Sequence, residues 1–192
     1  MVTINGKESD GRIHPQKFIL WVAMGSIVMM FAGLTSAYIV KKSQASWLEY
    51  SLPLVFWYST VAILVSSVTI NMALKAFKAR EMRQYRTLIT VTALLGLLFM
   101  GLQITGFANL EARNIPLFGS KSNSATSFLG VITILHMLHV LGGVIALLVI
   151  FIKAYVSKVK NYSSLPIEII STYWHFVDFL WIYLFIFFNW LR

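Results

Sequence analysis

Residues 128–152 read FLGVITILHMLHVLGGVIALLVIFI, an uncharged stretch of 25 residues in which one threonine and two histidines are the only polar side chains. At about 1.5 Å per residue, a helix of this length crosses the roughly 30 Å hydrocarbon core of a bilayer. Backbone amide and carbonyl groups find no water in that core, so a helix is the form that satisfies them. The stretch therefore predicts a transmembrane helix.

Four similar stretches lie on either side of this one. They have 22 to 24 residues each and cover residues 18–40, 52–74, 87–110 and 169–190. We therefore predict an all-α integral membrane bundle of five transmembrane helices. The bundle forms a single domain over residues 18–192, and a polar N-terminal tail over residues 1–17 precedes it.

The composition excludes several classes of protein. Of the 192 residues, 58% are hydrophobic and 12% are charged, too few polar groups to cover the surface of a soluble enzyme. The chain has no cysteine, which excludes disulfides, thiolate metal sites and cysteine nucleophiles. The net charge of +9 comes from residues between the apolar stretches. That distribution indicates contact with anionic lipid rather than with nucleic acid.

Lysine and arginine are divided unevenly between the two ends of the predicted helices. The end that holds residues 1–17, 75–86 and 153–166 has 11 of them, and the opposite end has 5. Short loops rich in positive charge stay on the cytoplasmic side. We therefore predict an N-terminus inside and a C-terminus outside.

Polar residues inside the apolar stretches are candidates for function, because they are costly in lipid. His136, His139 and Gly143 have offsets of 0, 3 and 7 and share one helical stripe. The small residue allows a close approach of helices, and the imidazoles can form hydrogen bonds across it. Ligation of a metal or haem, with His175 as a third ligand, is the alternative. Gln103 is predicted to bond a neighbouring helix.

A second stripe, in the last apolar stretch, has offsets of 0, 4, 7, 10 and 14. Its members are Glu168, Thr172, His175, Asp178 and Ile182. Asp178 lies near mid-membrane, where a carboxylate must be protonated, paired or hydrogen-bonded. The sequence predicts a structural pair with His175, three residues before it. A proton relay in a small proton-coupled transporter, which uses Glu168 as well, is the alternative.

Two motifs give the chain a family resemblance. Residues 136–143 (HMLHVLGG) and 173–181 (YWHFVDFLW), the latter with Trp174 and Trp181, resemble haem-copper terminal oxidase subunit III. Further matches are residues 31–38 and 94–103, and a glutamate seven residues before the histidine of the second motif. The chain is similar to the short, five-helix form of this family.

The resemblance implies a cofactor-free structural and assembly subunit. Such a subunit packs on the catalytic subunit I of a proton-pumping cytochrome c oxidase, holds phospholipid and is not functional alone. Haem and copper are expected in partner subunits, no catalytic residue is expected here, and the location is expected to be a bacterial plasma membrane. The same subunit in a quinol oxidase, or in a relative linked to nitric oxide reductase, remains the alternative.

Two positions depart from the family pattern. The family has Ser-Glu in its first shared helix, where this chain reads Ser26-Ile27. The carboxylate that gives the family its carbodiimide reactivity is therefore missing. A second family glutamate follows Gln103, and the position here is Gly106. A proton-collecting role that depends on either acid is not expected.

Overall fold

The computed structural model describes most of the chain. The described residues are 14–42, 52–113, 115, 117–119, 123–156 and 164–191. Residues 1–13 of the predicted polar tail lie outside them. The last residues of that tail are helical, because the first helix already begins at Pro15.

Five helices make up the fold. They are α1 (Pro15–Lys42), α2 (Val55–Lys78), α3 (Met82–Ala112), α4 (Ser124–Val156) and α5 (Leu165–Trp190). Each is long and apolar enough to span a membrane, and the described residues include no strand. The prediction of an all-α bundle with five membrane-spanning helices is confirmed, and the orientation of the termini stays a prediction.

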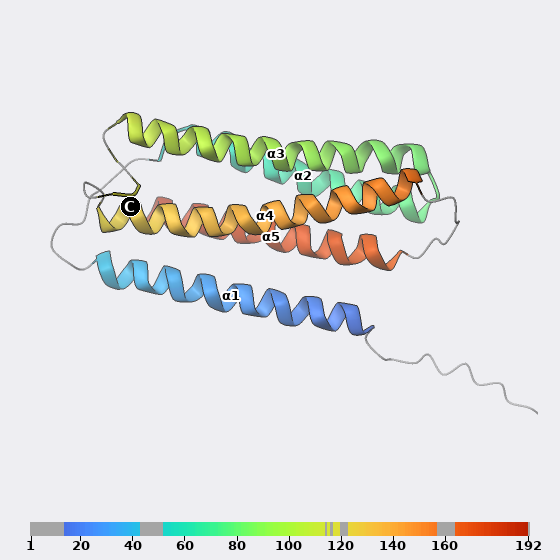
Figure 1. The fold of residues 1–192 in the computed structure, drawn as a ribbon, viewed down its shortest axis with the longest axis horizontal. Coiled ribbons are helices and arrows are strands. Elements are labelled where there is room, and N and C mark those ends of the chain that lie inside the picture. The colour runs from blue at the N-terminus through green and yellow to red at the C-terminus, as the bar shows by residue number, and fades with distance from the viewer. Residues whose placement is uncertain are drawn as a thin grey trace, which may run out of the picture.

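Four of the helices form a closed ring, and the fifth lies outside it. Within the described residues, α2 packs against α3 and α5, and α4 packs against the same two helices. Helix α1 contacts α4 and α5 only, and it lies along the edge of the bundle in Figure 1. It buries one narrow stripe, formed by Met24, Phe31, Thr35 and Tyr38. Lipid or a partner subunit is therefore free to cover most of α1.

The turn between α2 and α3 is the shortest connection that the structure describes. Arg80 has a positive φ of 62°, and its backbone N–H donates to Phe77 O, while Glu81 N–H donates to Ala76 O. This pair of hydrogen bonds is the Schellman motif, which closes a helix with one left-handed residue. The motif reverses the chain at once, and α2 and α3 therefore pack side by side over their whole length.

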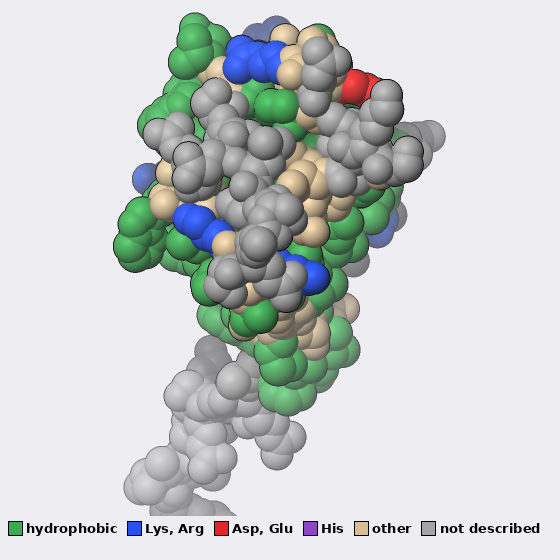
Figure 2. Space-filling model, turned by 90° about the vertical axis from the view of Figure 1, so that its left-hand side faces the viewer, with side chains coloured by type: hydrophobic (Ala, Val, Ile, Leu, Met, Phe, Trp, Pro, Cys, Tyr) green, Lys and Arg blue, Asp and Glu red, His purple; other side chains and the backbone are tan. Residues whose placement is uncertain are grey.

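The core runs through the centre of the ring. It contains the fully buried Trp174, Trp181 and Phe99 together with aliphatic side chains from α2 to α5, and α1 adds Phe31 and Tyr38. A smaller cluster around Tyr85 and Ile167 closes the end near the α2–α3 turn. Figure 2 shows the opposite end, where Lys and Arg side chains lie at the surface and hydrophobic side chains cover the flanks. This is the surface of a protein with lipid around it and water at its ends.

Candidate functional site

Trp174 of α5 is buried at the point where four helices meet. Its indole Nε1 donates a hydrogen bond of 3.0 Å to Ser66 Oγ on α2. Its six-membered ring lies over Gly96 of α3 and Gly143 of α4. A Cβ at Gly96 would be 2.7 Å from the indole Cη2, and one at Gly143 would be 3.0 Å from Cε3. Both glycines therefore make room for the indole, which joins α5 to three other helices.

Trp181, two turns further along α5, repeats this arrangement. Its Nε1 donates to Thr60 Oγ1 on α2 at 3.0 Å. Its ring stacks on His136 of α4, with ring centres 5.3 Å apart, and meets the edge of Phe99 of α3 at 5.0 Å. The two tryptophans thus form a central seam that holds the ring of helices together.

Among the described residues, the imidazoles of the two histidines of α4 form no hydrogen bond with another helix. His139 Nδ1 donates to Leu135 O of its own helix at 2.7 Å. His136 is fully buried, and neither of its ring nitrogens has a hydrogen-bond partner among the described residues. Instead, both rings pack edge-on against Phe31 of α1. The prediction of interhelical imidazole hydrogen bonds is wrong here, because aromatic packing occupies the stripe. The backbone of His139 does bond across, since its carbonyl accepts from Tyr173 of α5 at 3.0 Å.

His175 of α5 is held by two residues of α2. Its Nε2 lies 3.0 Å from Asn71 Oδ1, and its Nδ1 lies 2.6 Å from Ser67 Oγ. The amide oxygen can only accept, so Nε2 carries the proton and, in the neutral ring, Nδ1 accepts from the Ser67 hydroxyl. The predicted pair of His175 with Asp178 is therefore wrong, because residues one turn apart on α2 engage both ring nitrogens.

Asp178 lies in the interior without a direct partner. Its side chain is 3% exposed, and neither carboxyl oxygen forms a hydrogen bond with a described residue. The Ser67 hydroxyl of α2 is already bonded to His175. An unpaired carboxylate is very costly in such surroundings. We therefore treat Asp178 as a neutral acid.

Gln103 of α3 forms the kind of bond that its position indicates. Its Nε2 donates to Ser59 Oγ on α2 at 3.0 Å. Ser59, Thr60 and Ser66 in turn donate to carbonyl groups of their own helix. The polar face of α2 therefore accepts hydrogen bonds from α3 and α5 without leaving its own hydroxyl protons unsatisfied.

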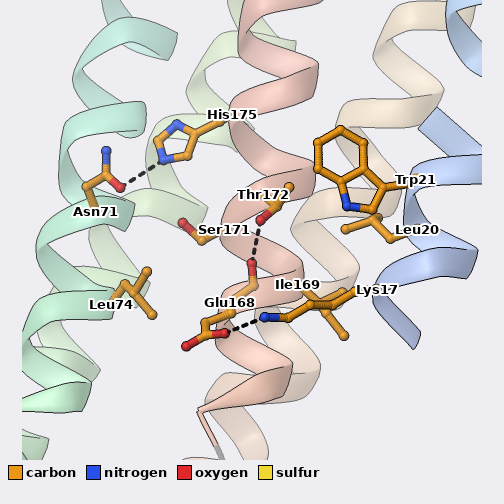
Figure 3. Close-up of a pocket in the computed structure, with 10 residues that line it drawn as sticks. All are labelled: Lys17, Leu20, Trp21, Asn71, Leu74, Glu168, Ile169, Ser171, Thr172 and His175. Atoms are coloured by element: carbon orange, nitrogen blue, oxygen red, sulfur yellow. Dashed lines mark hydrogen bonds and ion pairs between the residues drawn. The ribbon is translucent and has the colours of Figure 1, made fainter. Parts of the chain in front are cut away.

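Glu168 lies in the first turn of α5 and joins three helices by ion pairs. Its Oε2 lies 3.0 Å from Lys17 Nζ of α1, and its Oε1 lies 3.1 Å from Lys78 Nζ of α2. Figure 3 shows this end of the bundle, with Lys17 and Glu168 below and His175 above on α5. Such partly exposed pairs contribute about 0.2–1 kcal/mol each. The two ion pairs therefore help to position the helix ends, and they are a small part of the free energy of folding.

The described residues hold no cluster of metal-ligating side chains. Across the described ranges, no group of three or more His, Asp or Glu side chains is placed to hold a metal ion. His175, considered as a third ligand, uses both ring nitrogens on α2 and so joins two helices.

The hydroxyl residues of α2 are partners that the sequence analysis does not identify. Ser and Thr in membrane helices commonly bond their own backbone, so a single hydroxyl carries little information. A signal does exist, because hydroxyl pairs at 59–60 and 66–67 recur after seven residues. Trp174 and Trp181 have the same spacing on α5. Two antiparallel helices with matching two-turn repeats are able to pair along their length.

The comparison with protein families decides between the hypotheses. A family model described as cytochrome c oxidase subunit III matches residues 45–192. The chain belongs to the cytochrome c oxidase subunit III family. The matched range includes α2 to α5, and hence every residue of the seam. Membership in the subunit III family favours an oxidase subunit over an independent transporter.

Curated relatives agree with the subunit III family. A Mycobacterium tuberculosis protein named "Probable cytochrome c oxidase subunit 3" is 30% identical over 96% of this chain and 95% of its own. A protein of the same name from Nocardia farcinica is 30% identical over 94% and 93%. A Staphylococcus aureus protein named "Probable quinol oxidase subunit 3" is 26% identical over 95% and 91%.

The two departures from the subunit III pattern have a structural context. Ile27, where the resemblance implies a glutamate, packs half-buried against the main core. At Gly106, a Cβ would lie 2.8 Å from Cε2 of Phe56 on α2. A glutamate at this position would have to displace that ring.

Proposed function

We propose that this chain is the cofactor-free structural and assembly subunit III of a proton-pumping cytochrome c oxidase in a bacterial plasma membrane. It packs on the catalytic subunit, holds lipid and contributes no catalytic residue. Electron transfer, oxygen reduction and proton pumping then belong to the partner subunits, which carry haem and copper. The family match and the relatives named for cytochrome c oxidase support this proposal.

One observation carries the structural role. The indole N–H groups of Trp174 and Trp181 and both ring nitrogens of His175 form hydrogen bonds with α2. The motif at residues 173–181 thus uses its hydrogen-bonding side chains to join helices. A catalytic or ligand-binding motif presents such groups to a substrate instead. A rigid bundle with an apolar exterior is suited to packing against a larger membrane subunit.

The outer face agrees with this role. Helix α1 leaves Phe18, Trp21 and Met29 exposed on a helix that touches only two others. Lipid covers such a face in isolation, and a partner helix replaces that lipid on assembly. We therefore expect the catalytic subunit or annular lipid to cover α1.

Co-purification from native membranes tests the proposal. An affinity tag on this chain is expected to recover a complex with haem absorbance and oxygen consumption. The chain purified alone is expected to show neither, and its metal content should be far below one ion per chain. A tagged chain that recovers no haem protein from respiring cells contradicts the proposal, as does a stoichiometric metal in the isolated chain.

The relatives from Staphylococcus aureus support a second candidate, a quinol oxidase subunit III. The electron donor is bound by partner subunits, so the purified complex decides this point. Oxidation of reduced cytochrome c supports the first candidate. Oxidation of a short-chain quinol without activity toward cytochrome c supports the second.

A further inference from the structure

His175 lies between the protein interior and a cleft that opens where α5 begins. The cleft has a volume of about 400 Å³, and both His175 and Asn71 line it. Figure 3 shows the two side chains above Glu168 and Lys17, with the imidazole directed at the Asn71 amide. His175 comes seven residues after Glu168, which is about 10 Å further along the helix. A polar cleft of this size has room for several water molecules.

Ser67 differs from the other Ser and Thr residues of α2 in the group that receives its proton. The others donate to carbonyl groups of their own helix, and they are Ser59, Thr60, Ser66 and Thr69. The Ser67 hydroxyl lies 2.6 Å from Nδ1 of His175, and this nitrogen carries no proton in the tautomer that Asn71 selects. Ser67 therefore donates to His175, and the lone pairs of its oxygen are able to accept.

Asp178 is placed to use that acceptor. It lies one turn beyond His175 on the same stripe of α5. Its carboxyl group lies beside the Ser67 hydroxyl, without a hydrogen bond to it in the structure. Among the described residues Asp178 is the one buried acid, since Glu81 and Glu111 are exposed and Glu168 is partly exposed. As a neutral acid, Asp178 has an O–H group that can donate to the Ser67 oxygen.

These groups are ordered so that protons can move along them from the interior to the cleft. The proton of Asp178 moves to the Ser67 oxygen, and the Ser67 proton moves to Nδ1 of His175. The proton on Nε2 then passes to water beside Asn71. One bond to hydrogen forms for each one that breaks, and the products are a carboxylate, the other neutral tautomer of His175 and a hydronium ion. The reverse sequence returns a proton to the acid.

We propose that Asp178 is a buried proton-binding site that exchanges its proton with water in the cleft through Ser67 and His175. The charged groups that a proton meets at the mouth of the cleft are Glu168 and its two lysine partners. The same side chains of α5 that join the helices thus also connect the interior to water. The inference goes beyond the proposed function, and its test needs no partner subunit.

Infrared spectroscopy of the full-length chain in nanodiscs tests this path. A protonated carboxyl group has a carbonyl band that a carboxylate lacks, and the band shifts when deuterium replaces the proton. The difference between the unaltered chain and Asp178→Asn assigns the band of Asp178. After transfer to heavy water, we expect this band to shift before the backbone amides of α5 exchange, because those amides exchange only when the helix opens.

Variants of Ser67 separate a proton path from a packing role. We expect Ser67→Ala to slow exchange of the carboxyl group by about 100-fold, the lower end of what a positioned proton-transfer group contributes. Ser67→Thr keeps a hydroxyl and should restore the rate. A purely structural role predicts the opposite sign, because loss of a hydrogen bond between helices loosens the bundle and speeds exchange.

A control and a second variant complete the test. Thr69→Val removes another partly buried hydroxyl of α2, which bonds Thr92 of α3, and should leave exchange of the carboxyl group unchanged. His175→Gln interrupts the path at its next member and should slow exchange as Ser67→Ala does.

Four results would overturn the proposal. They are the absence of a protonated carboxyl band that Asp178→Asn removes, exchange no faster than that of the α5 amides, unchanged or faster exchange in both Ser67→Ala and His175→Gln, and equal slowing in Thr69→Val.

Discussion

Gly96→Ala is expected to loosen the helix ring by forcing Trp174 out of its place. The added Cβ would lie 2.7 Å from the indole Cη2 and 3.0 Å from Val144 Cγ2, where carbon atoms normally stay about 3.5–4.0 Å apart. The indole has little room to retreat, because its Nε1 is bonded to Ser66 and Gly143 lies against the same ring. Overpacking of this kind costs about 1–3 kcal/mol.

The matched control is Gly101→Ala on the same helix, where nothing lies within 4 Å of the added Cβ. Both variants gain the same helix propensity, up to about 1 kcal/mol in water, so the difference between them isolates the clash. The chain has no cysteine, and Ala73 is fully buried. In an Ala73→Cys background the chain has one thiol, which is buried while the chain is folded. Its labelling by a maleimide therefore measures unfolding of the full-length chain as dodecyl sulfate is added to the detergent micelles that hold it.

We expect Gly96→Ala to unfold at a lower detergent fraction than Gly101→Ala, by the equivalent of about 1–3 kcal/mol. Trp174→Phe removes the clashing atoms, and Gly96→Ala should cost less in that background. Coupling between directly touching residues is about 0.5–3 kcal/mol. Equal unfolding of the two alanine variants, or a cost of Gly96→Ala that is unchanged in the Trp174→Phe background, refutes the packing that we describe.

Three further predictions concern the hydrogen bonds of α5 with α2 and the carboxyl groups of the chain. Ser66→Ala leaves the indole N–H of Trp174 unsatisfied and should cost about 1–3 kcal/mol in the same unfolding assay; an effect below about 0.5 kcal/mol would contradict this. His175→Leu should destabilise more than Asp178→Leu, because the imidazole has two partners on α2 and the carboxyl has none among the described residues, and the reverse order would restore a structural pair between them. Carbodiimide should leave residues 18–40 unlabelled, because Ile27 and the rest of this range offer no carboxyl group, and an adduct mapped there by mass spectrometry would disprove that expectation.

The sequence is sufficient to predict the helices and, apart from the bond of Gln103 to a neighbouring helix, not the contacts between them. Apolar runs long enough for a bilayer have one economical form, so the five helices follow from the length of each run. The choice of partner for His175 depends on how α5 is rotated against α2. Spacing places Asp178 on the same stripe, but a side chain on a stripe is able to reach either its own helix or the next one. The packing between the helices, and not the spacing of residues along the chain, sets how α5 is rotated against α2.

The glycines show the same limit from another side. Small residues on a membrane helix indicate a close approach, and the sequence predicts that Gly143 permits one between helices. The structure fills that space with an indole from α5. A single sequence does not say whether a backbone or a side chain enters the gap beside a glycine. The large buried residues of the other helices decide it, and their positions follow only from the fold.

The short turn at Arg80 also has a consequence for how the protein is made. Three residues join α2 to α3. We therefore expect the two helices to leave the ribosome one after the other and to pack together before α4 and α5 are synthesised. Thr60 and Ser66, whose hydroxyl oxygens later accept from Trp181 and Trp174, are then already present, with their protons bonded to carbonyl groups of their own helix. In this order of events the hairpin of α2 and α3 is already in the bilayer when α5 is made. Helix α5, the last of the chain, then completes the ring of helices by packing on α2.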